Sequence, residues 1–144
     1  VEKAMTLYQE AYNLYVSENN EREASGILIN IANCHGELGE LEQCLATHLK
    51  SLAIQEKLGI KGYPLATNLT NIAVLYADLK EPAEALIWGR RARKIFEALD
   101  DSLSLSEVDF NIAINLFLRK ILRSVLFRYN FFSIIKFFTR TIRG

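Results

Sequence analysis

The sequence predicts an all-α fold in which antiparallel helix pairs stack into an elongated array. The triplet Asn-Ile-Ala occurs at positions 30–32, 71–73 and 111–113, so its three copies are almost evenly spaced. A period of roughly 20 to 50 residues is typical of proteins built from stacked repeats. Apolar and small residues also recur at steps of three and four over most of residues 2–117, which is the period of a helix packed on one face.

The first unit expected is half a repeat, over residues 1–18. One helical face carries Ala4, Leu7, Tyr8, Ala11, Leu14 and Tyr15. This face is what the second helix of a pair would present. Because the pattern is already under way at Val1, we expect the chain to be a fragment of a longer protein.

The first full repeat is expected over about residues 21–58. Its first helix should end at Gly39, because glycine adopts the left-handed conformation that closes a last helical turn. Its second helix is expected from about Leu41 to Leu58, with Cys44 and His48 on its inner face.

The second full repeat is expected over about residues 63–99. One helix is predicted near residues 65–79, followed by a break at Lys80-Glu81 and a second helix from Pro82. Proline is tolerated in the first turn of a helix, where its missing N–H would have had no intrahelical partner.

These units resemble the tetratricopeptide repeat family over about residues 2–117. That family places large, small and aromatic residues in the first helix, then small, aromatic and small residues in the second. The second repeat holds Ile72, Ala73, Tyr76, Ala85, Gly89 and Ala92 at these positions, with Trp88 displaced by one, and the first holds Ile31, Ala32, His35, Cys44, His48 and Ser51. The resemblance implies a right-handed α-solenoid. The spacing of the triplets is longer than the usual tetratricopeptide period of about 34 residues, and in this it is similar to the long-helix variety found in kinesin light chains.

The resemblance also implies a concave groove lined by the first helices of the pairs. Asparagine before the Ile-Ala pair offers a donor and an acceptor to an extended peptide backbone. The candidate peptide-binding residues are Asn30, Asn71 and Asn111, flanked by Asn33 and Asn68. The alternative is that these asparagines only solvate a surface or hydrogen-bond a neighbouring loop.

No set of residues predicts catalysis or a cofactor. The sequence has no glycine-rich phosphate loop, no nucleophile signature and no carboxylate pair spaced for acid–base chemistry, so we expect no enzyme activity. Cys34, His35, Cys44 and His48 match zinc ligands in type. They fall on core positions of the repeat, however, and we interpret them as packing residues rather than a metal site.

Charge is divided unevenly along the chain. Residues 1–118 contain ten basic and all 17 acidic residues, a net charge of −7, and the remaining seven basic residues follow. An acidic array repels phosphate, so we expect no nucleic-acid partner. The basic cluster Arg90, Arg91, Arg93 and Lys94 is interpreted as a solvated outer face rather than a site for an acidic ligand.

A third opening helix is expected over residues 104–117, with Ser104 or Ser106 as its N-cap, and the repeat pattern then stops. The next positions for small, aromatic and small residues hold Val125, Tyr129 and Phe132. Residues 118–144 form a basic, aromatic-rich tail that has three interpretations: a helix on an anionic membrane surface through residues 119–144, a closing helix of the array, or translated non-coding sequence. Basic residues interrupt it too often for a membrane span.

The function expected is that of a scaffold that binds a protein or peptide partner on the concave face. The alternative is a regulatory segment of a larger signalling enzyme. No signal peptide is visible, and the two closely spaced cysteines do not form a disulfide framework, so we expect a cytoplasmic protein.

Overall fold

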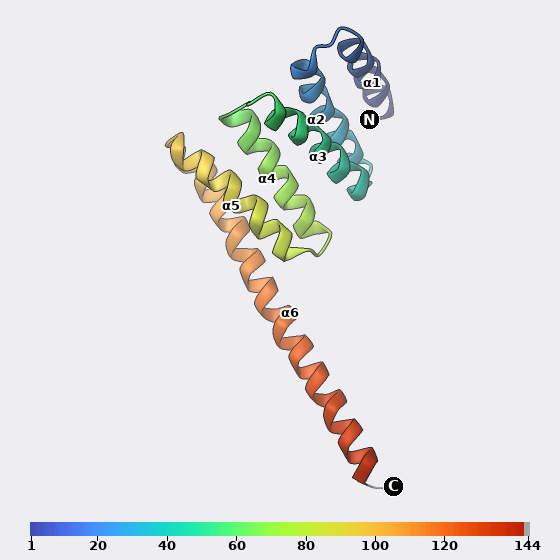
Figure 1. Ribbon diagram of the computed structural model, residues 1–144, viewed down its shortest axis with the longest axis vertical. Coiled ribbons are helices and arrows are strands. Elements are labelled where there is room, and N and C mark those ends of the chain that lie inside the picture. Colours follow the sequence, from blue (N-terminus) through green and yellow to red (C-terminus); the bar gives the residue numbers. More distant parts are fainter. Residues whose placement is uncertain (143–144) are drawn as a thin grey trace.

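The computed structural model describes the backbone of residues 1–142 and the side chains of residues 1–129. This part of the chain forms six α-helices and no strand, which confirms the predicted all-α class (Figure 1). The helices are α1 (Glu2–Ser17), α2 (Glu21–Glu37), α3 (Leu41–Lys57), α4 (Tyr63–Asp78), α5 (Pro82–Ala98) and α6 (Ser102–Ile142). Each helix packs on the next along the chain, and α4 also contacts α6.

Short turns set the antiparallel course of the helices. After α2, Gly39 has a φ of +76°, and its N–H and that of Glu40 bond back to the carbonyls of Gly36 and His35 at 3.0 and 2.9 Å. One repeat later, Lys80 adopts the same left-handed conformation at the end of α4. Each turn supplies hydrogen bonds to carbonyls at the helix end that have no intrahelical partner. It also reverses the chain, so that the next helix packs on the one before it.

Small residues lie where the helices approach most closely. Ala32, Ala66 and Ala92 have no exposed surface, and Ala85 is 2% exposed. A Cβ at Gly89 of α5 would lie 3.3 Å from Cγ1 of Ile112 on α6 and 3.9 Å from Cβ of Ala73 on α4. The expected interlocking of small and large residues is therefore present. The main core cluster surrounds Ala92 with larger side chains, among them Leu52, Leu69, Ile72, Phe96 and Val108.

Asp101, rather than Ser104 or Ser106, caps α6. Its carboxylate accepts hydrogen bonds from the backbone N–H of Ser104 at 3.1 Å and from the Ser104 hydroxyl at 2.7 Å. An N-cap aspartate commonly accepts a hydrogen bond from the backbone N–H of the residue three positions later. The cap is a local contact between residues three apart, and α6 accordingly begins at Ser102.

Within residues 1–142, the third repeat does not form a second helix that turns back. The boundary predicted after residue 117 lies inside α6, which continues without interruption to Ile142 (Figure 1). Ala113, the third copy of the small residue, is exposed, because none of the described helices covers it as α3 covers Ala32. The division between array and tail therefore stays a prediction.

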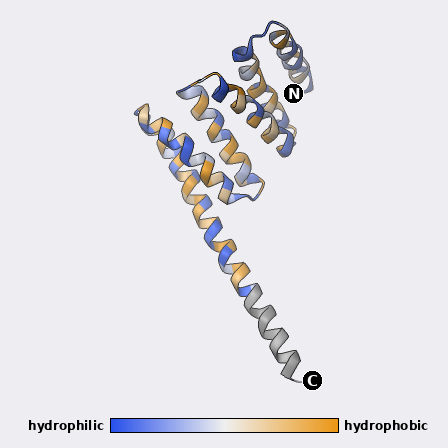
Figure 2. Cartoon of the chain, in the orientation of Figure 1, coloured by the Kyte–Doolittle hydropathy of each residue, from blue (hydrophilic) through white to orange (hydrophobic). Residues whose placement is uncertain are grey.

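Apolar residues, coloured orange, continue along α6 past the array (Figure 2). Leu122, Val125, Phe127 and Tyr129 are all exposed, the last by 74%. Up to residue 129 the helix does not fold back over the array, as a closing helix would; Phe132 lies beyond the described side chains. None of the helices in the described residues is long and apolar enough to cross a bilayer.

Enlarging a small residue at a helix contact should destabilise the fold. Ala92→Leu adds a bulky side chain where Ala92 has no exposed surface, and we expect the free energy of unfolding to fall by about 1–3 kcal/mol. Ala46→Leu makes the same change on the exposed face of α3 and should leave it within about 0.5 kcal/mol. Urea denaturation of both variants measures this; equal midpoints would contradict the packing described.

Candidate functional site

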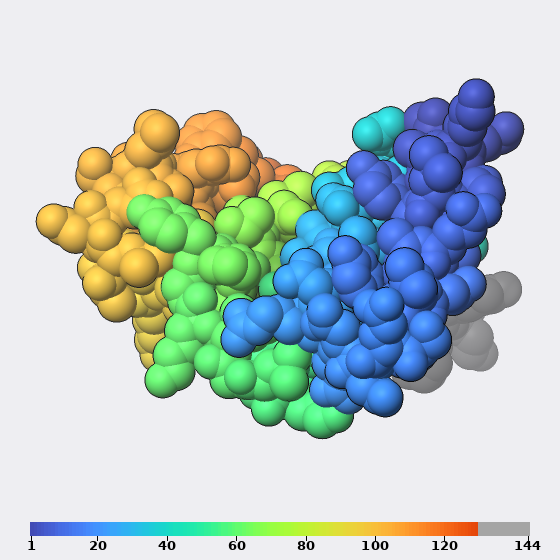
Figure 3. Space-filling view, turned by 90° about the horizontal axis from the view of Figure 1, so that it is seen from above, coloured from blue at the N-terminus to red at the C-terminus, as the bar shows by residue number. Residues whose placement is uncertain are grey.

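Two pockets lie on the same face of the array, one on each side of α4. The first, here called the N-terminal pocket, is lined by α2, α3 and α4. The second, the C-terminal pocket, lies between α4, α5 and α6 and has a volume of about 240 Å³. Val74 of α4 lines both, so it forms the ridge between them. Figure 3 shows this face as a hollow between α6 and the N-terminal helices, with the end of α4 at its bottom.

The pockets occupy equivalent positions in successive repeats. Asn71 lines the N-terminal pocket, and Asn111, its counterpart in the next copy of the triplet, lines the C-terminal pocket. The acidic residues Glu37 and Asp78 are likewise counterparts in successive repeats, and each lines one pocket. The repeat period therefore places equivalent side chains at regular intervals along the hollow.

Three of the five predicted asparagines line these pockets. Asn33 is exposed and Asn71 half-buried, and both line the N-terminal pocket; Asn111 lines the C-terminal one. Asn30 is half-buried on α2 and lines neither pocket. Within the described part of the chain, no group hydrogen-bonds the side-chain amides of Asn33, Asn71 or Asn111.

Asn68 does not lie on the hollow face, contrary to the expectation. Its side chain has no exposed surface and is held between α3 and α4. Its Oδ1 lies 2.8 Å from Nδ1 of His48, and its Nδ2 donates to Oε1 of Gln55 at 2.9 Å. The equivalent residue one repeat earlier is Ile27. An apolar residue at this repeat position already indicates that the position belongs to the core.

The buried contact of His48 with Asn68 constrains the protonation of the histidine. Because Asn68 Nδ2 is used as a donor to Gln55, its Oδ1 is the acceptor, and His48 Nδ1 carries the proton. Burial lowers the pKa of His48, and the hydrogen bond to Asn68 offsets this only in part. His48 is therefore a neutral core residue that donates one hydrogen bond.

The cysteine and histidine side chains do not gather into one site. Cys34 and Cys44 are buried free thiols, and burial raises the pKa of the Cys44 thiol against the lowering effect of the Gly36 backbone. His35 contacts Oε2 of Glu40 at 2.6 Å, whereas His48 bonds Asn68. The described residues contain no group of three or more side chains able to hold a metal ion.

Two of the four residues in the basic cluster on α5, Arg91 and Arg93, pair with acidic residues of neighbouring helices. Arg91 pairs with Glu56 of α3 and stacks over the Trp88 ring at 4.9 Å. Arg93 Nε contacts Oδ1 of Asp109 on α6 at 2.6 Å. These contacts connect α5 to both adjacent repeats, which gives two of the arginines a structural role.

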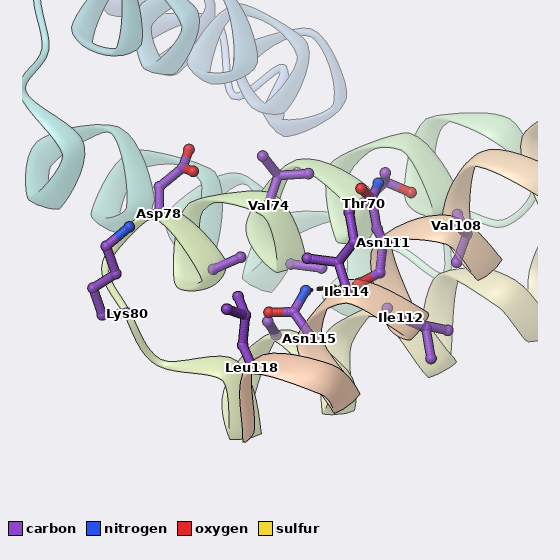
Figure 4. Close-up of a pocket in the computed structure, with 14 residues that line it drawn as sticks. Thr70, Val74, Asp78, Lys80, Val108, Asn111, Ile112, Ile114, Asn115 and Leu118 are labelled. Atoms are coloured by element: carbon purple, nitrogen blue, oxygen red, sulfur yellow. Dashed lines mark hydrogen bonds between the residues drawn. The ribbon is translucent and has the colours of Figure 1, made fainter. Parts of the chain in front are cut away.

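Asn115, which is not among the predicted site residues, is the most unusual polar residue of the hollow. It lines the C-terminal pocket, is only 5% exposed, and stands where the earlier repeats have the buried apolar residues Cys34 and Leu75. Its Nδ2 donates to the backbone carbonyl of Asn111 at 2.9 Å, but its buried Oδ1 has no partner among the described residues (Figure 4). The signal was available: an asparagine at a repeat position that is otherwise apolar.

Fold and hollow together define an α-helical repeat protein with a pocketed face. A family model of the tetratricopeptide repeat matches residues 23–98, and the chain belongs to this family. Tetratricopeptide repeats mediate protein–protein interaction and are typically non-catalytic. The kinesin-light-chain-like variety stays a prediction.

The fold is shared with a solved structure, that of BtubC (BKLC) from P. vanneervenii. The two superimpose with a TM-score of 0.75 at 21% sequence identity, over 83% of this chain and 50% of that one. This chain thus spans about half the length of BtubC, and the likeness at this identity is one of fold. No curated protein matches the chain in sequence.

Acid should weaken the fold through His48. Its folded pKa lies below the unfolded value of about 6.5, so below that pH the unfolded state binds more protons and stability falls. We expect His48→Gln to reduce this loss between about pH 7 and pH 5, measured by thermal melts across the range. His35→Gln makes the same change at the partly exposed histidine that contacts Glu40, and this variant should still lose the stability that His48 costs in acid. An unchanged pH profile in His48→Gln would contradict the assignment.

Proposed function

We propose that the chain is a binding scaffold that holds an extended segment of a partner protein in the hollow formed by α2, α4 and α6. The observation that carries this proposal is the presence of two pockets in repeat register on one face, each lined by an asparagine of the Asn-Ile-Ala motif. A segment lying across the ridge at Val74 would contact both pockets. The chain itself performs no turnover in this proposal.

The asparagines would recognise the backbone of the partner. A carboxamide offers both a donor and an acceptor, which matches the alternating C=O and N–H groups of an extended chain. The amides of Asn33, Asn71 and Asn111 have no hydrogen-bond partner among the described residues, so they are available to a ligand. Asn68 is excluded because its amide is buried and already bonded.

The pockets would select the side chains of the partner. The C-terminal pocket has a largely apolar lining that includes Ala73, Ala77, Ala85 and Ile114. Glu37 and Asp78 line the two pockets, and residues 1–118 have a net charge of −7. A neutral or basic segment is therefore favoured over an acidic one, because like charges oppose association.

We infer that this binding takes place in a reducing compartment such as the cytoplasm. The two cysteines are buried free thiols, and Sγ of Cys44 would lie 3.4 Å from a Cβ at Gly36, within the packed contact of α2 and α3. Cysteines used as small apolar core residues are common where thiols remain reduced.

Selection of a displayed peptide library on the full chain tests the proposal. Asn33→Ala and Asn71→Ala should each weaken a selected peptide by about two- to tenfold, the effect of one neutral hydrogen bond, measured by fluorescence anisotropy. Asn13→Ala, on the exposed surface of α1, is the matched control and should bind as the parent does. Selected peptides that bind both variants with parental affinity would show that the hollow is not the binding face.

A further inference from the structure

The C-terminal pocket contains a buried hydrogen-bond acceptor that the fold does not use. Asn115 is 5% exposed and its Oδ1 has no partner within the described residues. The orientation of the amide follows from its one bond, because the carbonyl oxygen of Asn111 can only accept, so the atom facing it at 2.9 Å is Nδ2. A buried acceptor that remains unpaired is unfavourable, and such an atom in a native protein calls for an explanation.

The same position in the other two repeats shows that packing does not require a polar residue there. Cys34 and Leu75 are 6% and 7% exposed, as buried as Asn115, and Leu75 is part of an apolar cluster with Ala32 and Cys44. An apolar side chain therefore meets the needs of the fold at this position. The amide of Asn115 adds a group that only a ligand would use.

The space beside Asn115 is large enough for a side chain. Gly89 lines the C-terminal pocket at the repeat position where His48 lines the N-terminal pocket, and the volume of the C-terminal pocket is about 240 Å³. Figure 4 shows the amide oxygen of Asn115 directed toward Leu118, which lines the same pocket. Leu118 is 40% exposed, so it has room to turn aside and admit a donor.

We infer that the C-terminal pocket binds a partner side chain that has an apolar body and one uncharged N–H or O–H donor, which bonds Oδ1 of Asn115. This deepens the proposed function and rests on it. A cationic donor fits less well, because Lys80 lines the pocket together with Asp78 and a charge buried against apolar walls is costly unless it is paired. A purely apolar side chain would leave Oδ1 unpaired.

Binding of phenol and anisole to the full chain tests the inference by NMR titration. The two probes have similar apolar bodies, but only phenol has a donor. We expect phenol to shift the side-chain amide signals of Asn115 and to bind about three- to tenfold more tightly than anisole, as one added hydrogen bond would produce. Equal affinities of the parent protein for the two probes would overturn the inference.

Asn115→Leu removes the acceptor and copies the residue at the equivalent position 75. The preference for phenol should then disappear, with a ratio of affinities near one, while Asn13→Leu on α1 should retain the preference of the parent. A preference that persists in Asn115→Leu would overturn the inference. The parental comparison of phenol with anisole does not depend on the folding of any variant.

The outcomes separate this inference from the proposed function. If library peptides bind through Asn71 but bind Asn115→Leu as well as the parent, the hollow binds peptides and the role of Asn115 is wrong. If phenol binds at Asn115 and no peptide is selected, the donor subsite stands and the peptide-binding proposal fails.

Discussion

The close approach of helix backbones is the constraint on which the structure depends. Alanine and glycine at the contacts let larger residues of the facing helix enter the space, as Gly89 does for Ile112. Each pair then has one preferred packing on the next, because a larger residue at such a position would push the helices apart. In a linear array this contact is repeated, so stability comes from successive neighbours rather than from one central core.

The regular packing also produces the candidate site. Helices that stack with a constant offset present equivalent residues along one face, and this brings Asn33 and Asn71 to one pocket and Asn111 to the next. The core residues differ between repeats, but the equivalent asparagines still lie along the same face. His48 and Asn68 form a buried polar pair between α3 and α4, while α5 has Gly89 at the position of His48.

At the C-terminal end of the array, α6 has a face that no described helix covers. α6 packs on α5 with one face, whereas Ala113 and Phe117 are exposed on the face that no described helix covers. The apolar stripe of a repeat helix is stabilised only by a neighbour. The C-terminal pocket lies beside this open end, between α4, α5 and α6.

The sequence by itself determined the helices, the repeat period, and the small residues at the contacts. These features follow from local periodicity and from volume, which a single chain displays directly. The repeat register marks positions 68 and 115 as apolar in other repeats, but only the tertiary structure showed how the two asparagines are placed: Asn68 points into the core and Asn115 is buried beside a pocket. The structure also shows that Asp101 caps α6 and that α6 continues past residue 117. The physical reason is that burial of a polar side chain depends on which neighbouring helix covers it, and this is a property of the packed array.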